Sequence, residues 1–251
     1  MSGIEDSNQG AGWNDHDTPY GPIHSYDGND HSYGGSSGGN GGGHSGIDDK
    51  STINIASTSV YNGTMMSMCV NNLKKHEGFK NTMYKDTAGN ITVGIGHLLA
   101  NAAMAASLPF TRTNTIHAHG DDIESEVSIS KGDITSAFNA FKTDSKKAPL
   151  NMHLSNDAII GQCISDVQTT VSGLKGLYAG FDSFPNSAKT ALVDMGFNLG
   201  IPRLHSEFPK FNSAVNRKDW NTAANESHRT GIGEGRNNDT KGQLQQAASG
   251  H

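Results

Sequence analysis

The sequence has few cysteines, no excess of positive charge and no long apolar run. Its two cysteines, Cys69 and Cys163, are too few for a disulfide framework. We expect two buried free thiols, and a single bridge stays open as the alternative. A formal net charge of −6 argues against nucleic acid as a partner, because nucleic-acid binding needs a basic surface. No apolar run approaches the roughly 20 residues that span a bilayer.

The shortage of apolar residues is local. Thirteen of the 31 glycines fall within the first fifty residues, in a segment rich in Ser, Asn, Asp and His. Such a segment cannot offset the entropy of ordering its backbone, so we expect residues 1–52 to form a disordered tail. The tail histidines have irregular spacing and no accompanying cysteine, which favours a solvated tail over a metal site. These are His16, His24, His31 and His44. We expect neither a metal nor a cofactor.

Residues 53–251 are long enough for one folded domain, and their pattern is mostly helical. Apolar residues at helical spacing predict a helix that ends near Glu77, with Gly78 suited to a left-handed cap. These residues are Val60, Met65, Met68, Cys69, Leu73 and His76. Asp86–Asn90 is typical of a turn, and 90–97 alternates as a strand with Ile91, Val93 and Ile95 on one face.

The chain becomes helical again from about Leu154. An apolar stripe over 188–199 is closed by Gly200 and Pro202, Pro209 suits the first turn of a further helix, and a short helix follows Asp219. Residues 101–153 have little regular pattern apart from one helix around Ile134 to Phe141. The fold class expected is therefore α+β and mostly helical.

Glu77 and Asp86 could supply the two carboxyl groups that hydrolysis of a glycosidic bond requires. One group acts as an acid for the leaving oxygen, and the other acts on the water or on the sugar cation. Two acids nine positions apart are more often merely solvated, so the surrounding residues have to decide the assignment.

Those residues do carry a resemblance. The strings His76-Glu-Gly-Phe79, Tyr84-Lys-Asp86, Gly89-Asn-Ile-Thr92 and Gly94-Ile-Gly-His-Leu-Leu99 closely resemble the active-site run of the phage-type lysozymes, glycoside hydrolase family 24. The resemblance implies a two-lobed lysozyme fold with a small β-containing lobe. It also implies a catalytic triad of Glu77, Asp86 and Thr92.

The resemblance continues downstream. Residues 188–200 are similar to the family's central helix, and 101–153 is longer than its family counterpart. The resemblance implies a structural ion pair between His97 and Asp166. It implies substrate contacts at Gly96, Leu98, Asn198 and Arg236. Arg236 resembles an arginine that pairs with the catalytic Glu, and an ordinary surface arginine is an equal alternative.

The mechanism implied is acid catalysis on peptidoglycan. A protonated Glu77 would donate to the leaving sugar oxygen, while Asp86 and Thr92 would hold the attacking water on the opposite face. That arrangement predicts inversion, with the carboxyl groups roughly 6.5–9.5 Å apart. The presence of Asp86 and Thr92 counts against a lytic transglycosylase, which needs a single acid.

The tail carries a second resemblance. Gly10-Ala-Gly-Trp13, Pro19-Tyr-Gly21, Ile23-His24 and the glycine run after them resemble the translocation segment of E-type colicins. This implies binding to periplasmic Tol proteins through Gly10, Gly12 and Trp13, although Gln9 and Ala11 depart from the usual motif. A plain linker stays open as the alternative.

Together the resemblances predict a colicin-like bacteriocin, released without a signal peptide, that acts in the periplasm of a competing Gram-negative cell. The expected partners are peptidoglycan, Tol proteins, an outer-membrane porin and a cognate immunity protein, and we expect a monomer. Two rivals remain. One is a phage endolysin or secreted effector with a disordered leader, and the other is a non-catalytic peptidoglycan-binding protein.

Overall fold

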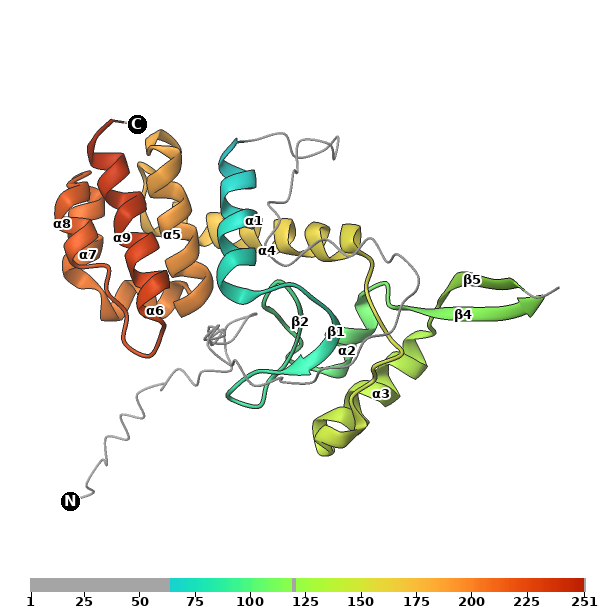
Figure 1. The fold of residues 1–251 in the computed structure, drawn as a ribbon. Coiled ribbons are helices and arrows are strands. Elements are labelled where there is room, and N and C mark those ends of the chain that lie inside the picture. Colours follow the sequence, from blue (N-terminus) through green and yellow to red (C-terminus); the bar gives the residue numbers. More distant parts are fainter. Residues whose placement is uncertain (1–63, 119–120, 251) are drawn as a thin grey trace, which may run out of the picture.

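The computed structural model describes residues 64–118 and 121–250, which form a mostly helical α+β fold (Figure 1). The predicted tail, residues 1–52 with Gly10, Gly12 and Trp13, lies outside the described residues. Within them, no helix is long and apolar enough to cross a membrane. The α-helices are α1 (Thr64–Glu77), α2 (Ala102–Ser107), α3 (Lys131–Thr143), α4 (Asn156–Leu177), α5 (Asn186–Leu199), α6 (Ile201–Glu207), α7 (Pro209–Asn216), α8 (Trp220–Asn225) and α9 (Glu234–Ala248).

A small antiparallel sheet follows α1. It consists of β1 (Lys80–Lys85), β2 (Ile91–Gly94) and β3 (His97–Leu98) in the order β1-β2-β3. The prediction of one strand over 90–97 is wrong, because β2 ends at Gly94 and a turn at Ile95–Gly96 leads into β3. Gly94 and Gly96 have φ of +70° and +66°, a conformation that residues with a Cβ rarely adopt. The two glycines therefore break the strand.

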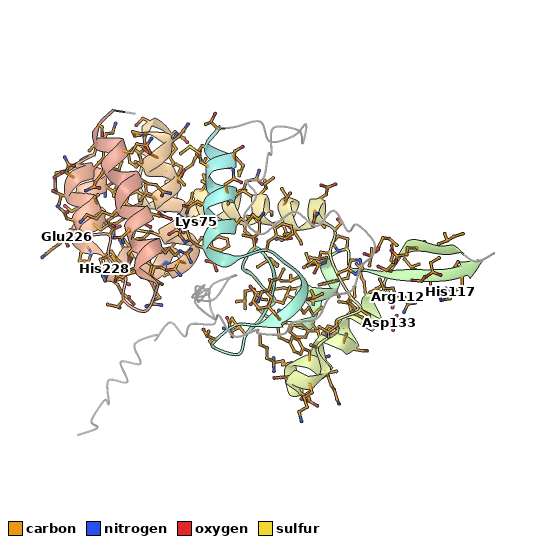
Figure 2. The ribbon with its side chains drawn as sticks, viewed as in Figure 1. Lys75, Arg112, His117, Asp133, Glu226 and His228 are labelled. Atoms are coloured by element: carbon orange, nitrogen blue, oxygen red, sulfur yellow. The ribbon has the colours of Figure 1, made fainter. Side chains whose placement is uncertain are left out.

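Residues 101–153 hold the predicted helix and an unpredicted hairpin. Helix α3 confirms the helix around Ile134 to Phe141, and it packs against α2. The hairpin pairs β4 (Thr111–Ala118) with β5 (Asp121–Ser128). It projects from the rest of the molecule (Figure 1), and Figure 2 shows Arg112 and His117 on this ribbon, far from Glu226 and His228. The small lobe, defined as residues 78–153, thus consists of the sheet, α2, α3 and the hairpin.

The helical lobe, defined as residues 178–250, is built around α5. Helix α4 contacts β2 and β3 at one end and α5 and α6 at the other, so it connects the lobes. Every residue from Thr190 to Leu199 is buried, because α5 packs against α1, α4 and α9. Several predictions are confirmed here: α5 ends before Gly200, Pro209 begins α7, and the short helix α8 follows Asp219. Asp219 caps α8 by accepting from the Thr222 N–H at 3.1 Å.

The two cysteines are buried and free, which confirms the prediction of two buried thiols. Burial raises the pKa of the Cys69 thiol to about 12, and it raises the pKa of Cys163 as well. Both side chains therefore act as small apolar residues of the core.

Candidate active site

Glu77 is the last residue of α1 and lies where the two lobes meet. Gly78, at φ +78°, ends the helix, and its N–H donates to the Lys74 carbonyl at 3.0 Å. The Glu77 side chain is only 3% exposed. On the sheet side it lies against Gly96, where a Cβ would come within 3.0 Å of the Glu77 Cγ. The turn between β2 and β3 therefore packs closely against the Glu77 side chain.

On the other side Glu77 meets Arg236 of α9. Arg236 Nη1 donates to Glu77 Oε1 at 2.6 Å, and both side chains are buried. The alternative of an ordinary surface arginine is therefore wrong. Burial raises the pKa of the Glu77 carboxyl, and the Arg236 guanidinium opposes this only in part.

Asp194 of α5 is a part of the site that was not among the residues predicted from the sequence. Its carboxylate accepts from Arg236 Nε at 3.0 Å and from Arg229 Nη2 at 2.7 Å, and it forms an ion pair with Arg236 Nη2 at 2.8 Å. Thr240 Oγ1 donates to it at 3.2 Å. Burial alone would raise the pKa of Asp194, but the two guanidinium groups outweigh burial and hold the pKa below its usual range. Glu77, Arg236, Asp194 and Arg229 thus form one buried cluster of alternating charge.

One signal in the sequence pointed to Asp194. It is the single acidic residue within the apolar stripe 188–199, and a buried carboxylate must find a partner. The stripe does not indicate which partner. Arg229 lies in the irregular loop before α9. The sequence of this loop has no helix or strand periodicity, so it does not predict which way the Arg229 side chain points.

Asp86 lies in the turn after β1, and Thr92 lies in β2. Asp86 Oδ1 accepts from the Ala88 and Asn90 N–H groups at 3.0 and 2.7 Å, and Oδ2 accepts from Asn90 Nδ2 at 3.1 Å. Three N–H donors therefore hold the carboxylate of Asp86 in its own turn. Thr92 is 4% exposed in β2, between Tyr84 of β1 and Leu98 of β3. Their roles and the predicted spacing of the carboxyl groups stay predictions.

The structure brings His97 and Asp166 together. His97 Nδ1 lies 2.9 Å from Asp166 Oδ2, both groups are buried, and Gln162 Nε2 donates to Asp166 Oδ1 at 3.0 Å. The pair joins β3 to α4. Asn198 is buried and accepts from Arg229 Nη1 at 3.2 Å, so it borders the charged cluster. Substrate contacts by Gly96, Leu98, Asn198 and Arg236 stay predictions.

The arrangement is suited to proton donation. A buried carboxyl group with a raised pKa keeps its proton at a pH where a solvated one has lost it. In the described part of the chain, no group of three or more His, Cys, Asp or Glu residues is placed to hold a metal ion. The chemistry that the Glu77 carboxyl group can support is general acid catalysis.

Comparisons with known proteins agree with this chemistry. Residues 74–244 match a family model described as phage lysozyme. The chain is similar to "Probable T4-type lysozyme 2" of Dictyostelium discoideum, with 28% identity over 160 residues, which are 64% of this chain and 81% of the relative. It is also similar to "Probable T4-type lysozyme 1" of the same organism, with 26% identity over 162 residues, which are 64% and 82%.

Proposed function

Because the chain belongs to the phage lysozyme family, whose members hydrolyse peptidoglycan, we propose that it is a muramidase. It would cleave the β-1,4 bond between N-acetylmuramic acid and N-acetylglucosamine. The proposal rests on Glu77, a buried carboxyl group with a raised pKa whose Oε1 is held by Arg236. The Glu77 carboxyl group can therefore carry the proton and donate it to the substrate.

In the proposed reaction Glu77 protonates the glycosidic oxygen as the bond to the anomeric carbon breaks. Water attacks that carbon from the opposite face and gives its proton to Asp86, with Thr92 as the second group that holds the water. Three N–H donors hold the Asp86 carboxylate in a fixed position in its turn. The product then has the inverted configuration.

Glu77→Gln tests the acid. We expect turnover of isolated peptidoglycan to fall by roughly 10²–10⁴-fold, because the amide cannot donate the proton. Glu207→Gln is the matched control, since Glu207 is exposed on α6 and pairs with Arg203. A Glu77→Gln variant with wild-type turnover would contradict the proposal. A wild-type protein that binds peptidoglycan without cleaving it would favour the non-catalytic alternative. Proton NMR of the first product distinguishes inversion from retention.

We further propose that residues 1–52 deliver the enzyme to the periplasm of a competing Gram-negative cell. Support comes from the Gly10-Ala-Gly-Trp13 string and the glycine-rich composition around it, which suit an unfolded segment that presents one aromatic anchor. Its partners would be periplasmic Tol proteins and an outer-membrane porin. A producer of such an enzyme would need an immunity protein that inhibits it.

Killing of intact Gram-negative cells tests the delivery. Trp13→Ala is expected to abolish killing while leaving turnover of isolated peptidoglycan unchanged, because the anchor is separate from Glu77. Tyr33→Ala, another aromatic residue of the same segment, is the control and is expected to kill normally. If Trp13→Ala and wild type kill equally, the delivery proposal is wrong. A wild-type protein that cleaves isolated peptidoglycan but spares intact cells would favour an endolysin or a secreted effector.

A further inference from the structure

We propose that Asp194 is a positioning residue for this reaction, which holds Arg236 so that one N–H of its guanidinium orients Glu77 without taking the catalytic proton from it. The inference rests on the proposed role of Glu77 as the acid. Asp194 is 1% exposed and contacts Arg236. It acts through Arg236, and no motif of the sequence indicated it.

The geometry divides Arg236 unequally between the two carboxyl groups. Asp194 contacts two nitrogens of the guanidinium, because Nε donates to its Oδ1 at 3.0 Å and its Oδ2 at 3.2 Å and Nη2 lies 2.8 Å from Oδ1 in an ion pair. Glu77 accepts from Nη1 alone, at 2.6 Å. When a carboxylate contacts one edge of a guanidinium, the plane of the guanidinium and the directions of its other N–H bonds are fixed. Because Asp194 is 1% exposed and accepts from Arg229 and Thr240 as well, it is itself fixed in place. The direction of the N–H that reaches Glu77 is therefore set by α5 rather than by α9 alone.

The charges explain why Glu77 can keep a proton beside an arginine. The titratable groups that face Glu77 are Arg236 on α9, Asp194 on α5, Arg229 in the loop before α9 and Cys163 on α4. The Cys163 thiol is neutral, because burial raises its pKa. Asp194 therefore supplies a negative charge that competes with Glu77 for the two guanidinium groups. Without it, both would favour ionised Glu77, and the acid would lose its proton at lower pH.

The test is the pH dependence of kcat/KM on isolated peptidoglycan. The activity of a general acid falls as pH rises through its pKa. The alkaline limb of the kcat/KM–pH profile therefore reports the loss of the proton from Glu77. Asp194→Asn keeps the shape of the side chain and removes its charge. We expect the alkaline limb to move to lower pH by about one unit or more. A residue with a merely structural role would lower the amount of folded enzyme but would leave the limb in place.

A second variant separates positioning from summed charge and from folding. Asp194→Asn leaves two buried arginines with less compensation, which endangers the fold. The double variant Asp194→Asn with Arg229→Met removes one charge of each sign, so the summed charge of the cluster is unchanged. It still frees Arg236 from its two-point contact, and we expect the limb to move to lower pH as in the single variant. Asp239→Asn, on α9 but paired with Lys75 and His76 of α1, is the control and should keep the wild-type limb.

Each outcome has one meaning. A limb at lower pH in both variants, with the control unchanged, supports the inference. A wild-type limb in either folded variant overturns it, and so does a double variant that cannot fold, because Asp194 would then serve stability alone. Absence of hydrolysis by the wild-type protein at every pH would instead refute the muramidase itself.

Discussion

Glu77 lies in surroundings that oppose its ionised form, and this has a consequence for stability. A carboxyl group whose pKa in the folded protein lies above the ordinary 4.5 binds its proton more tightly there than in the unfolded chain. Its contribution is fully present below pH 4.5 and is lost as pH rises through the raised pKa. Each unit of such a shift corresponds to about 1.4 kcal/mol.

Glu77→Gln is therefore expected to gain stability relative to wild type as the pH rises. Glutamine cannot ionise, and its amide oxygen can still accept from Arg236. Urea unfolding of both proteins at about pH 4 and about pH 7 measures the difference. The free energy of unfolding of the variant, relative to that of wild type, should be higher at about pH 7 than at about pH 4. A loss would show that the ion pair with Arg236 outweighs burial.

Gly96 offers a test of how closely the turn supports the acid. Gly96 and Gly94 both have positive φ, so alanine at either position should lower the free energy of unfolding by roughly 1–2 kcal/mol. The added methyl differs in what it touches: Glu77 in the first case, and Ile159 of α4 in the second. We expect both variants to unfold at similarly lower temperatures, while turnover of peptidoglycan falls by about tenfold or more in Gly96→Ala alone. Equal loss in both would show that strain in the turn, rather than the position of Glu77, limits activity.

The ends and faces of the elements were predictable wherever one side of an element is apolar and a capping residue marks its end. Helix α5 has an apolar stripe and Gly200, and α8 has Asp219 as its N-cap. Helix α9 gave no such pattern, because it buries Arg236, Asn237 and Thr240 beside few apolar residues. The strand prediction over 90–97 treated its glycines as ordinary strand positions. Arg236 of α9, which donates to Glu77, was indicated by the family resemblance and by no local pattern of α1.

The β4–β5 hairpin escaped prediction for a related reason. Both of its faces are solvated, so its residues lack the alternation that marks a half-buried strand. Ile116 and Ile123 are direct cross-strand partners, yet they are 53% and 55% exposed. The strands contact chiefly each other. The hairpin therefore contributes little buried apolar surface to the fold.

Removal of the hairpin should consequently be tolerated. Thr111 and Ser128 face each other across the two strands, so an Asn-Gly turn can join them in place of residues 112–127. We expect the melting temperature to change by only a few degrees, because the side chains removed are largely exposed to solvent. Turnover of isolated peptidoglycan should be retained. Phe138→Ala in the neighbouring α3 is the contrasting control and should cost roughly 3–5 kcal/mol, since Phe138 is buried. A hairpin-free chain that folds but loses turnover would show that the hairpin contacts the substrate.

At the scale of the whole molecule, polar contacts between distant segments hold the site together. The Glu77–Arg236 pair joins the end of α1 to α9, and the His97–Asp166 pair joins β3 to α4. Both are buried, so removal of one partner would leave an uncompensated polar group. The acid therefore depends on residues that lie more than a hundred positions apart in the chain.

All of these contacts lie between Thr64 and Gly250, and this leads to a prediction about the division of the chain. Two shortened proteins, one beginning at Thr64 and one at Ile53, the start of the folded domain expected from the sequence, are both expected to fold. Both should cleave isolated peptidoglycan within about twofold of the full chain, because the Glu77 cluster is intact in each. Neither should kill intact Gram-negative cells, since both lack Trp13. Turnover by the longer protein but not by the shorter would place residues 53–63 inside the catalytic domain. Killing by either would separate delivery from the first 52 residues.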